Sequence, residues 1–346
     1  MVSHSQRGST MLVSAAACWG AGTVITKQAL GEVPPLTLLP MQLLVSSVVL
    51  LGLAGVLRLQ FVWSSNLGRL AALGALNPGL AYTLGVLGLS HLSASMSVLL
   101  WALEPAFIVI ISHVLLRDVV APRVRLAISL AVCGVLIVVY QPGTNGSILG
   151  VVLVLAAVGT CAIYSVAARR LLGDHESLLV VIAQQLVALA FTAVVLLLAL
   201  IFDGQSFTLH DFSAPTWLAA ITSGALYYGL AFWFYLAGLR QMSASVAGSF
   251  LTLIPVFGLA AGAAFGEVLS SRQWLGAGVV LLAITAVARI QAANDSTHLS
   301  TNENSSLPDR LTGRRKSHQP VERSQTAETA QRRTGWRSAR SSKPPT

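Results

Sequence analysis

Glu104 is a carboxylate deep inside an apolar stretch of the sequence, twelve residues after the stretch begins at Leu92 and next to Pro105. A charge is costly where apolar surroundings replace water, so such a group can exchange a proton or hold a cationic group of a ligand. Pro105 also leaves a nearby backbone carbonyl without its helical partner. Ionisable groups in such places usually serve function, and we expect Glu104 to line a substrate cavity. The alternative interpretation is a protonated or hydrogen-bonded packing residue.

Polar and aromatic side chains in the other apolar stretches could bind polar or planar groups of a substrate. Besides Glu104, the candidates for substrate binding are Trp19, Gln42, Asn77, Tyr82, Trp101, Tyr164 and Tyr227, with Gln184 and Trp233 as further polar and aromatic candidates. Each of them alone also fits an anchor at a membrane surface or a bridge between helices. Pro105 and Pro255 each remove a helical hydrogen bond, which predicts a hinge or a packing kink at each position.

The sequence offers little for catalysis. His113 and Asp118 have the H-x-x-x-x-D spacing of glycerolipid acyltransferases, but the flanking residues do not match that family. An H-E-x-x-H motif, paired intramembrane aspartates and a Ser/His/Asp set are all missing from the sequence. The cysteines Cys18, Cys133 and Cys161 lack C-x-x-C spacing and are interpreted as packing residues. We therefore expect no catalytic residue, no metal and no cofactor, and keep an intramembrane acyltransferase-like enzyme as the alternative.

The elements that position these residues must lie in a membrane. The 346 residues are 54% apolar and only 10% charged, and the mean hydropathy is +0.72. A soluble domain carries about 25% charged residues, so the bilayer must be the solvent of this chain. Ten stretches are long and apolar enough to cross it as helices; they run over residues 10–30, 36–57, 70–89, 92–115, 124–140, 148–168, 178–202, 217–239, 243–266 and 274–290.

The positive charges predict how these stretches are oriented. Positive loop residues stay in the cytoplasm, and nine arginines then share one side with the N-terminus, whereas the opposite side has only Lys27 and Arg272. We expect a multi-pass protein of the bacterial inner (plasma) membrane with both termini cytoplasmic. Because the net charge of +9 divides between these loops and a basic tail, it does not indicate nucleic acid binding.

An internal repeat relates the two halves of the chain. A shift of 150 residues aligns 74–107 with 224–257, and 14 of the 34 aligned positions are identical. The matches include the Ser-Ala-Ser sequences that begin at Ser93 and Ser243, and Pro105 with Pro255, whereas Glu104 aligns with Ile254. Five spans are an odd number, so the second copy enters the membrane from the opposite side. The predicted fold is an all-α membrane protein of ten transmembrane helices in two inverted five-helix repeats, a symmetry that suits alternating access.

Several short motifs strengthen this prediction: Ala17-Cys18-Trp19-Gly20 with Lys27, the Ser-Ala-Ser turn at 93–95, Pro105, and Gly266-Glu267. Together they resemble the EamA-type transporters of the drug/metabolite transporter superfamily over about residues 10–290. The resemblance implies a carrier with a central cavity that moves metabolites such as amino acids or their derivatives, often outward. That family often has an arginine early in its second helix. This chain has Pro40-Met41-Gln42 there, so we assign no residue to the role of that arginine.

The resulting domain organisation has four parts: a cytoplasmic N-terminus (1–9), two EamA-like repeats (10–140 and 147–290), and a basic tail (292–346) whose composition predicts disorder. A membrane sensor that signals through this tail is a second alternative to the carrier. The expected partners are a small-molecule substrate, the lipid bilayer and a coupling proton, with no nucleic acid.

Small and charged residues near the helix ends suggest packing and oligomer contacts. Gly258, Gly262 and Gly266 form a bare helix face, which favours packing inside one bundle over a dimer seam, so the chain is a monomer or a homodimer. Asp118 with Arg123 and Glu267 with Arg272 repeat an acid-to-arginine spacing, and we expect helix-end charges and loop salt bridges there.

Overall fold

The computed structural model describes residues 4–60, 64–116, 122–139, 147–171, 177–203, 212–239, 241 and 250–305. The described residues form helices and turns and no strand. Seven helical segments among them are long and apolar enough to cross a membrane: 6–29, 35–56, 65–90, 94–115, 148–168, 178–202 and 214–238. The chain is thus an all-helical membrane protein. Residues 1–300 form one compact unit, and of the second unit, 301–346, the structure describes only the end of the last helix.

Most predicted stretches contain one helix, and several are divided into two or three. The α-helices are α1 (His4–Ala29), α2 (Pro35–Val56), α3 (Ser65–Ala72), α4 (Ala81–Ser90), α5 (Ala94–Trp101), α6 (Glu104–Leu116), α7 (Pro122–Val139), α8 (Ile148–Leu171), α9 (Ser177–Asp203), α10 (Ala214–Ser223), α11 (Ala231–Leu239), α13 (Ile254–Ala264) and α14 (Ser271–Ser305). Short 3₁₀ helices η1 (Leu73–Ala75) and η5 (Leu251–Leu253), and π-helices η2 (Leu76–Leu80) and η4 (Gly224–Leu230), join some of them.

The divisions fall at prolines and at corresponding places of the two halves. The predicted stretch 92–115 is two helices, because Pro105 has no N–H for the carbonyl of Trp101, where α5 ends. Glu104 therefore begins α6 instead of lying within one continuous helix. Pro255 likewise lies in the first turn of α13, directly after η5. The π-helices η2 and η4 also lie 150 residues apart, and the sequence analysis did not predict them.

The last helix extends beyond its predicted end. α14 continues past Ile290 to Ser305, so the first part of the segment expected to be a disordered tail is helical. Residues 306–346 lie outside the described residues, as do Arg117, Asp118, Arg240 and Ser243-Ala244-Ser245.

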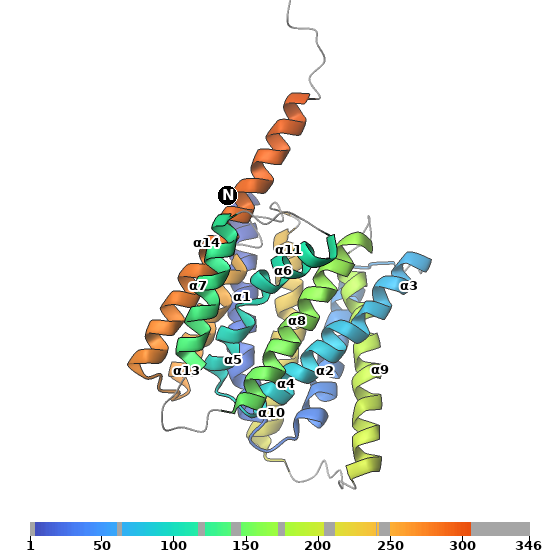
Figure 1. Ribbon diagram of the computed structural model, residues 1–346. Helices are drawn as coiled ribbons and strands as arrows, with labels where there is room; N and C mark the ends of the chain where they lie inside the picture. Colours follow the sequence, from blue (N-terminus) through green and yellow to red (C-terminus); the bar gives the residue numbers. More distant parts are fainter. Residues whose placement is uncertain are drawn as a thin grey trace, which may run out of the picture. The chain divides into compact units, whose positions relative to one another are not determined.

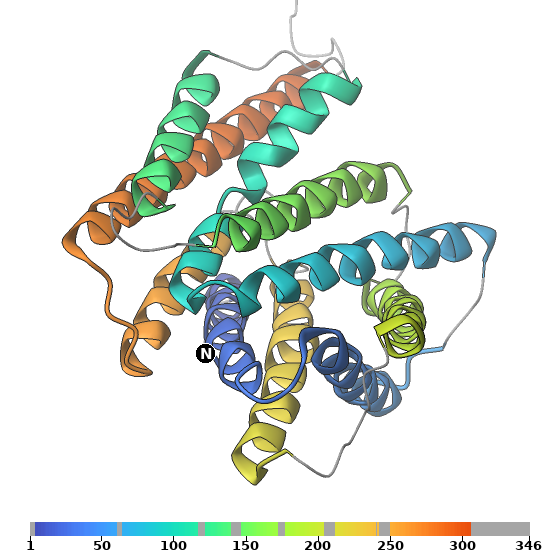
Figure 2. The same ribbon diagram turned by 60° about the horizontal axis from the view of Figure 1, so that its bottom comes forward.

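The helices of the bundle pack in matching pairs. α1 lies beside α11 and α13, and α8 lies beside α4 and α6 (Figures 1 and 2). α2 contacts η4, and α9 contacts η2, while α2 and α9 contact each other. Each of these contacts thus has a counterpart under the 150-residue shift, apart from the contact of α2 with α9, which are themselves counterparts.

Glycines allow the backbones of these paired helices to approach each other closely. A Cβ on Gly88 of α4 would lie 2.5 Å from Val154 Cγ2 and 2.9 Å from the carbonyl oxygen of Gly150. Its counterpart Gly238 would meet Leu12 Cγ at 2.6 Å and the carbonyl oxygen of Gly8 at 3.1 Å. Helix axes can approach this closely only where a side chain is missing.

A second close crossing joins α7 and α14, which lie side by side in Figure 2. A Cβ on Gly134 would lie 3.0 Å from the carbonyl oxygen of Gly276, and one on Gly276 would lie 2.8 Å from that of Gly134. The contact is reciprocal, so each glycine makes room for the backbone of the other.

The glycine face of α13 packs inside this bundle. A Cβ on Gly258 would meet Val98 Cγ1 at 2.7 Å, and one on Gly262 would meet Ser95 Oγ at 2.5 Å. Gly20, from the Ala-Cys-Trp-Gly motif, faces the same helix, because its Cβ would lie 2.6 Å from the backbone nitrogen of Gly258. Gly266 has a positive φ of 87°, which favours glycine and turns the chain after α13.

We expect Gly88→Ala to destabilise the fold by about 1–3 kcal/mol, because the new methyl group meets the α8 backbone in a packed interior. The matched control is Gly52→Ala on the exposed face of α2, where an added Cβ meets nothing within 4 Å. That control should gain up to about 1 kcal/mol of helix propensity. Thermal unfolding of the purified protein in detergent measures both changes, and equal unfolding temperatures for the two variants would contradict the close packing.

Candidate functional site

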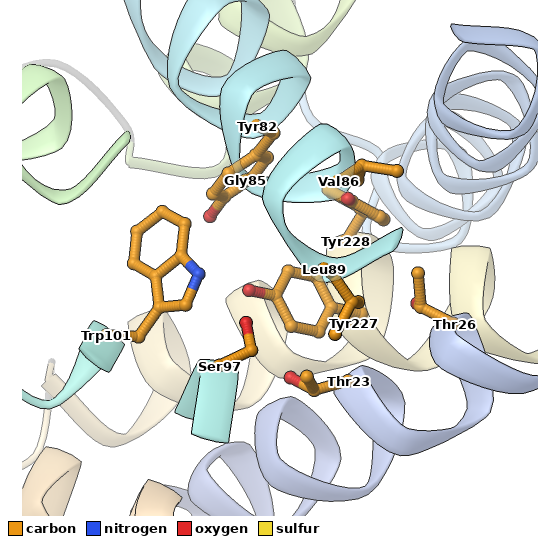
Figure 3. A pocket seen from close by; sticks show the side chains of 10 residues that line it. All are labelled: Thr23, Thr26, Tyr82, Gly85, Val86, Leu89, Ser97, Trp101, Tyr227 and Tyr228. Carbon is orange, nitrogen blue, oxygen red and sulfur yellow. The ribbon is translucent and has the colours of Figure 1, made fainter. Parts of the chain in front are cut away.

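A cavity lies between helices of both halves of the chain. Its walls come from α1, α4, α5 and η4, and Figure 3 shows the side chains around it. The lining residues are Thr23, Thr26, Tyr82, Gly85, Val86, Leu89, Ser97, Trp101, Tyr227 and Tyr228. The wall therefore combines aromatic rings with hydroxyl groups.

The aromatic rings form one connected cluster. Tyr82 lies at its centre, with ring centroids 5.8 Å from Trp101, 5.8 Å from Tyr227 and 5.2 Å from Tyr228, all edge to face. Tyr227 and Tyr228 are 4.8 Å apart. Edge-to-face pairs fix ring orientation, so the cluster gives the cavity a stable wall.

The cavity is small in this conformation. The centre of a water-sized sphere can occupy only about 20 Å³ of it, which is room for about one water molecule. A metabolite needs several hundred cubic ångströms, of the order of 300 Å³ or more for a typical ligand pocket. The helices around the cavity must therefore separate before a whole metabolite can enter.

Glu104 lies next to this cluster, one helical turn after Trp101. Its Oε1 accepts a hydrogen bond from the Cys161 thiol of α8 at 3.1 Å. Cys161 packs in one cluster with Tyr82 and Tyr228, so this contact places the carboxyl group beside the aromatic rings. The side chain is half-buried and borders the cavity residues without being one of them. The sequence analysis treated Cys161 as a packing residue and did not predict its contact with the carboxyl group.

Three of the predicted binding residues, Tyr82, Trp101 and Tyr227, line the cavity together. Trp19 instead packs on two rings of α11: its ring centroid lies 5.3 Å from that of Phe232 and 5.7 Å from that of Tyr235. It supports the α1–α11 contact and is not a lining residue.

The predicted polar residues Gln42, Asn77 and Tyr164 are not among the lining residues, although Gln42 contacts one of them. Gln42 is fully buried and donates to Thr26 Oγ1 at 3.0 Å and to Ser223 Oγ at 2.6 Å, so it bridges helices of both halves. The Tyr164 hydroxyl donates to Gln184 Oε1 at 2.8 Å. Asn77 is buried in η2. Trp233, a further candidate, stacks on Phe234.

Seven of the ten lining residues are not among the predicted binding residues, and four of these carry a hydroxyl group: Thr23, Thr26, Ser97 and Tyr228. Thr23 and Thr26 follow Trp19 at helical spacing, and Ser97 follows the Ser-Ala-Ser turn, so their positions within recognised motifs were the available signal. Ser, Thr and Tyr carry no charge, and hydropathy alone does not separate them from packing residues.

The α4–α5 turn lies between the lining residues Leu89 and Ser97 in the chain, and charged groups hold it in place. Lys27 Nζ donates to the carbonyl oxygens of Leu89 and Ser90 at 2.9 and 3.2 Å. Glu267, which follows α13, accepts hydrogen bonds from the backbone N–H groups of Ala94 at 2.7 Å and Ser95 at 2.9 Å. A cation thus meets the C-terminus of α4, and an anion meets the N-terminus of α5, as the helix dipoles favour. The sequence analysis expected Glu267 only as a local helix-end charge and did not predict this contact between halves.

A second carboxylate connects the two halves in the loop after α1. Glu32 accepts hydrogen bonds from the backbone N–H and the hydroxyl of Ser213, both at 2.8 Å, at the start of α10. These bonds, the backbone bond first, lower the pKa of the Glu32 carboxyl below its ordinary value. The ionised form is therefore the form that holds the contact.

We expect Glu32→Gln to lower the thermal unfolding temperature at neutral pH, where Glu32 is ionised. A lowered pKa stabilises the fold at all pH values above the ordinary pKa, and this contribution is lost as pH falls through the lowered pKa. The difference between wild type and variant, measured by unfolding in detergent across a pH series, should therefore close only under strongly acidic conditions. A difference that is absent at neutral pH, or unchanged in acid, would contradict an ionised contact.

Comparison with known proteins matches this chain to transporters. A profile of the EamA-like transporter family matches residues 6–140 and again residues 148–289. The uncharacterized transporter YetK of Bacillus subtilis (strain 168) is 30% identical over 257 residues, which cover 71% of this chain and 75% of that protein. An uncharacterized transporter of Archaeoglobus fulgidus is 25% identical over 276 residues, covering 78% and 95% of the two chains.

The fold also matches a solved structure. A crystal structure with a TM-score of 0.59 and 20% sequence identity covers 82% of this chain and 99% of its own. At this identity the match supports the fold alone. The family and its relatives indicate a transporter and not an enzyme.

Proposed function

Because the chain belongs to the EamA-like transporter family, we propose that this membrane transporter is a secondary carrier that exports small metabolites by alternating access. Amino acids or related compounds are the proposed substrates, and a proton is the proposed coupling ion. The proposed location is the bacterial inner membrane, with both termini cytoplasmic. The observation that carries the proposal is the small cavity between helices of both halves, next to a turn whose backbone is held by Lys27 and Glu267.

Two inverted five-helix halves are part of this proposal. The same family profile matches twice in succession, and described helices overlap all ten predicted stretches. The glycine contacts of α4 with α8 recur between α11 and α1, and Gly134 and Gly276 contact each other reciprocally. These repeated contacts support two halves that can rock about a shared centre.

Access to the cavity would alternate by loosening one end while the other closes. In the present conformation, Glu267 and Glu32 hold parts of opposite halves together at one end. Pro105 and Pro255 lie in the first turns of α6 and α13, where the missing N–H groups leave the chain free to bend, and we assign both as hinges. Closing contacts and hinges of this kind are what a two-state carrier requires.

Glu104 is the residue to which we assign proton coupling. It is a carboxyl group inside a membrane span, next to the cavity, and its position in the other half is Ile254. A carboxyl group that gives up and regains its proton on opposite sides of the membrane would link proton movement to substrate movement.

Reconstitution into liposomes tests the carrier and its coupling. With a panel of labelled metabolites, we expect gradient-dependent transport of one class, and Glu104→Gln should reduce the gradient-dependent component by about tenfold or more because the exchangeable proton is gone. Glu303→Gln, which removes a carboxylate outside the two halves, is the matched control and should transport like wild type. Unchanged transport and pH dependence in Glu104→Gln would count against this role.

The inverted topology makes a separate prediction. In a variant that lacks Cys18, Cys133 and Cys161, single cysteines are placed at Gly143, Asp203 and Arg169. A membrane-impermeant thiol reagent should label the first two positions from one side and the third from the other, because the positive residues predict opposite sides. Labelling of all three from the same side would refute the inverted halves.

A further inference from the structure

Ser97 carries a hydroxyl group that the fold leaves without a partner. The residue is 1% exposed, and its Oγ makes no hydrogen bond. The hydroxyl of a helical Ser or Thr residue usually donates a hydrogen bond to the backbone carbonyl four residues earlier. Thr23 does so on Trp19 at 3.0 Å, and Thr83 on Gly79 at 2.8 Å. A buried hydroxyl without a partner is costly, so this one is available for a ligand.

The Ser97 hydroxyl points into the aromatic cavity. In Figure 3 it faces the same space as the Tyr227 hydroxyl and the indole nitrogen of Trp101. The two threonine hydroxyls of the wall each have a partner, since Thr26 accepts from Gln42 and Thr23 donates to Trp19. Among the lining residues, Ser97 is the one whose buried side-chain oxygen has no hydrogen-bond partner, so its oxygen can accept a hydrogen bond from a ligand.

The surroundings of this hydroxyl favour positive charge. None of the ten lining residues is basic, and four of them are aromatic, with π-systems that attract cations. The carboxyl group of Glu104 lies beside the cluster. Lys27, also on α1, has its ammonium group directed to the carbonyls of Leu89 and Ser90, so its charge is used at the α4–α5 turn. A carboxylate in the cavity would meet Glu104 without a free cation to balance it.

We propose that this cavity recognises the protonated amino group of the substrate, with the Ser97 hydroxyl as hydrogen-bond acceptor, the rings of Tyr82, Trp101 and Tyr227 as the cation-binding wall, and Glu104 as counter-charge. Among the amino acids and related compounds proposed above, this narrows the substrate class to small primary amines without a carboxylate, and the inference rests on the proposed carrier function. The present cavity, with room for about one water molecule, fits an ammonium head group of similar size. The rest of the substrate enters when the halves separate.

Binding to the full-length protein in detergent tests this without requiring transport. Calorimetric titration compares butylamine with butanol, its neutral counterpart, and with norvaline, which adds a carboxylate to the same skeleton. We expect butylamine to bind at least about tenfold more tightly than butanol, as a hydrogen-bonded charge is worth more than a neutral group in a desolvated site. Norvaline should bind more weakly than butylamine, because its carboxylate meets Glu104.

Two substitutions identify the groups responsible. Ser97→Ala should weaken butylamine binding about tenfold, the value of a hydrogen bond to a charged group. Ser47→Ala is the matched control, since Ser47 is also a buried hydroxyl without a partner but lies outside the cavity lining. It should bind butylamine like wild type. Glu104→Gln should also weaken butylamine binding and leave butanol unaffected.

The ligand comparison on the wild-type protein tests the amine assignment, and the paired variants test the role of Ser97. Equal binding of butylamine and butanol by wild type, or tighter binding of norvaline than of butylamine, would overturn the amine assignment even if Ser97→Ala did not fold. Equal losses in Ser97→Ala and Ser47→Ala would overturn the role of Ser97. If the amine preference holds but liposomes transport no amine, the carrier proposal fails while the recognition site stands.

Discussion

Close approach of helix backbones at glycine is the contact on which this fold depends. Inside a bilayer, burying apolar side chains against one another gains little, because lipid tails are equally apolar, and association depends on van der Waals packing and hydrogen bonds. Gly88, Gly238, Gly134 and Gly276 provide that packing, with backbone atoms of the facing helix within about 3 Å of where a Cβ would lie. Gly20 does the same against α13, which explains why the Ala-Cys-Trp-Gly motif ends in glycine.

Buried polar side chains then fix the cavity wall on this frame. The π-helix η4 interrupts regular backbone bonding, and Gln185 Nε2 donates to the carbonyl oxygen of Tyr228 at 2.7 Å. Ser46 on α2 donates to the Oε1 of the same glutamine at 2.6 Å. The chain of contacts joins α2, α9 and η4, so the backbone at Tyr228 is held by a hydrogen-bonded network and not by apolar packing alone. An unsatisfied carbonyl in the membrane interior costs roughly several kcal/mol, and Gln185 prevents that cost.

Hydropathy predicts the all-helical membrane class, because spans of about 20 apolar residues are visible in the residues themselves. The family comes instead from a resemblance of several short motifs, such as Ala17-Cys18-Trp19-Gly20 with Lys27. Neither predicted the division of the fourth stretch at Trp101 or the π-helices, which depend on local backbone bonding. Tyr82, Trp101 and Tyr227 were predicted as binding residues, and they share one wall. Ser97 was missed, since whether a helical serine bonds its own backbone or faces a cavity is set by the neighbouring helices. Glu267 was misjudged for the same reason: its partners lie more than 170 residues away in the chain.

The sequences of the two halves differ at positions beside the cavity and share glycine at positions where helix backbones meet. Gly74, Gly79 and Gly88 recur as Gly224, Gly229 and Gly238, and all of these face a neighbouring helix closely. In contrast, Tyr82, Ser97, Trp101 and Glu104 correspond to Phe232, Ala247, Leu251 and Ile254, so the first half supplies hydroxyl groups and a carboxyl group where the second has apolar side chains. In the carrier that we propose, the symmetry that would let the frame open to either side is kept in the glycines. Selectivity for a charged head group would then depend on the positions at which the repeat has diverged.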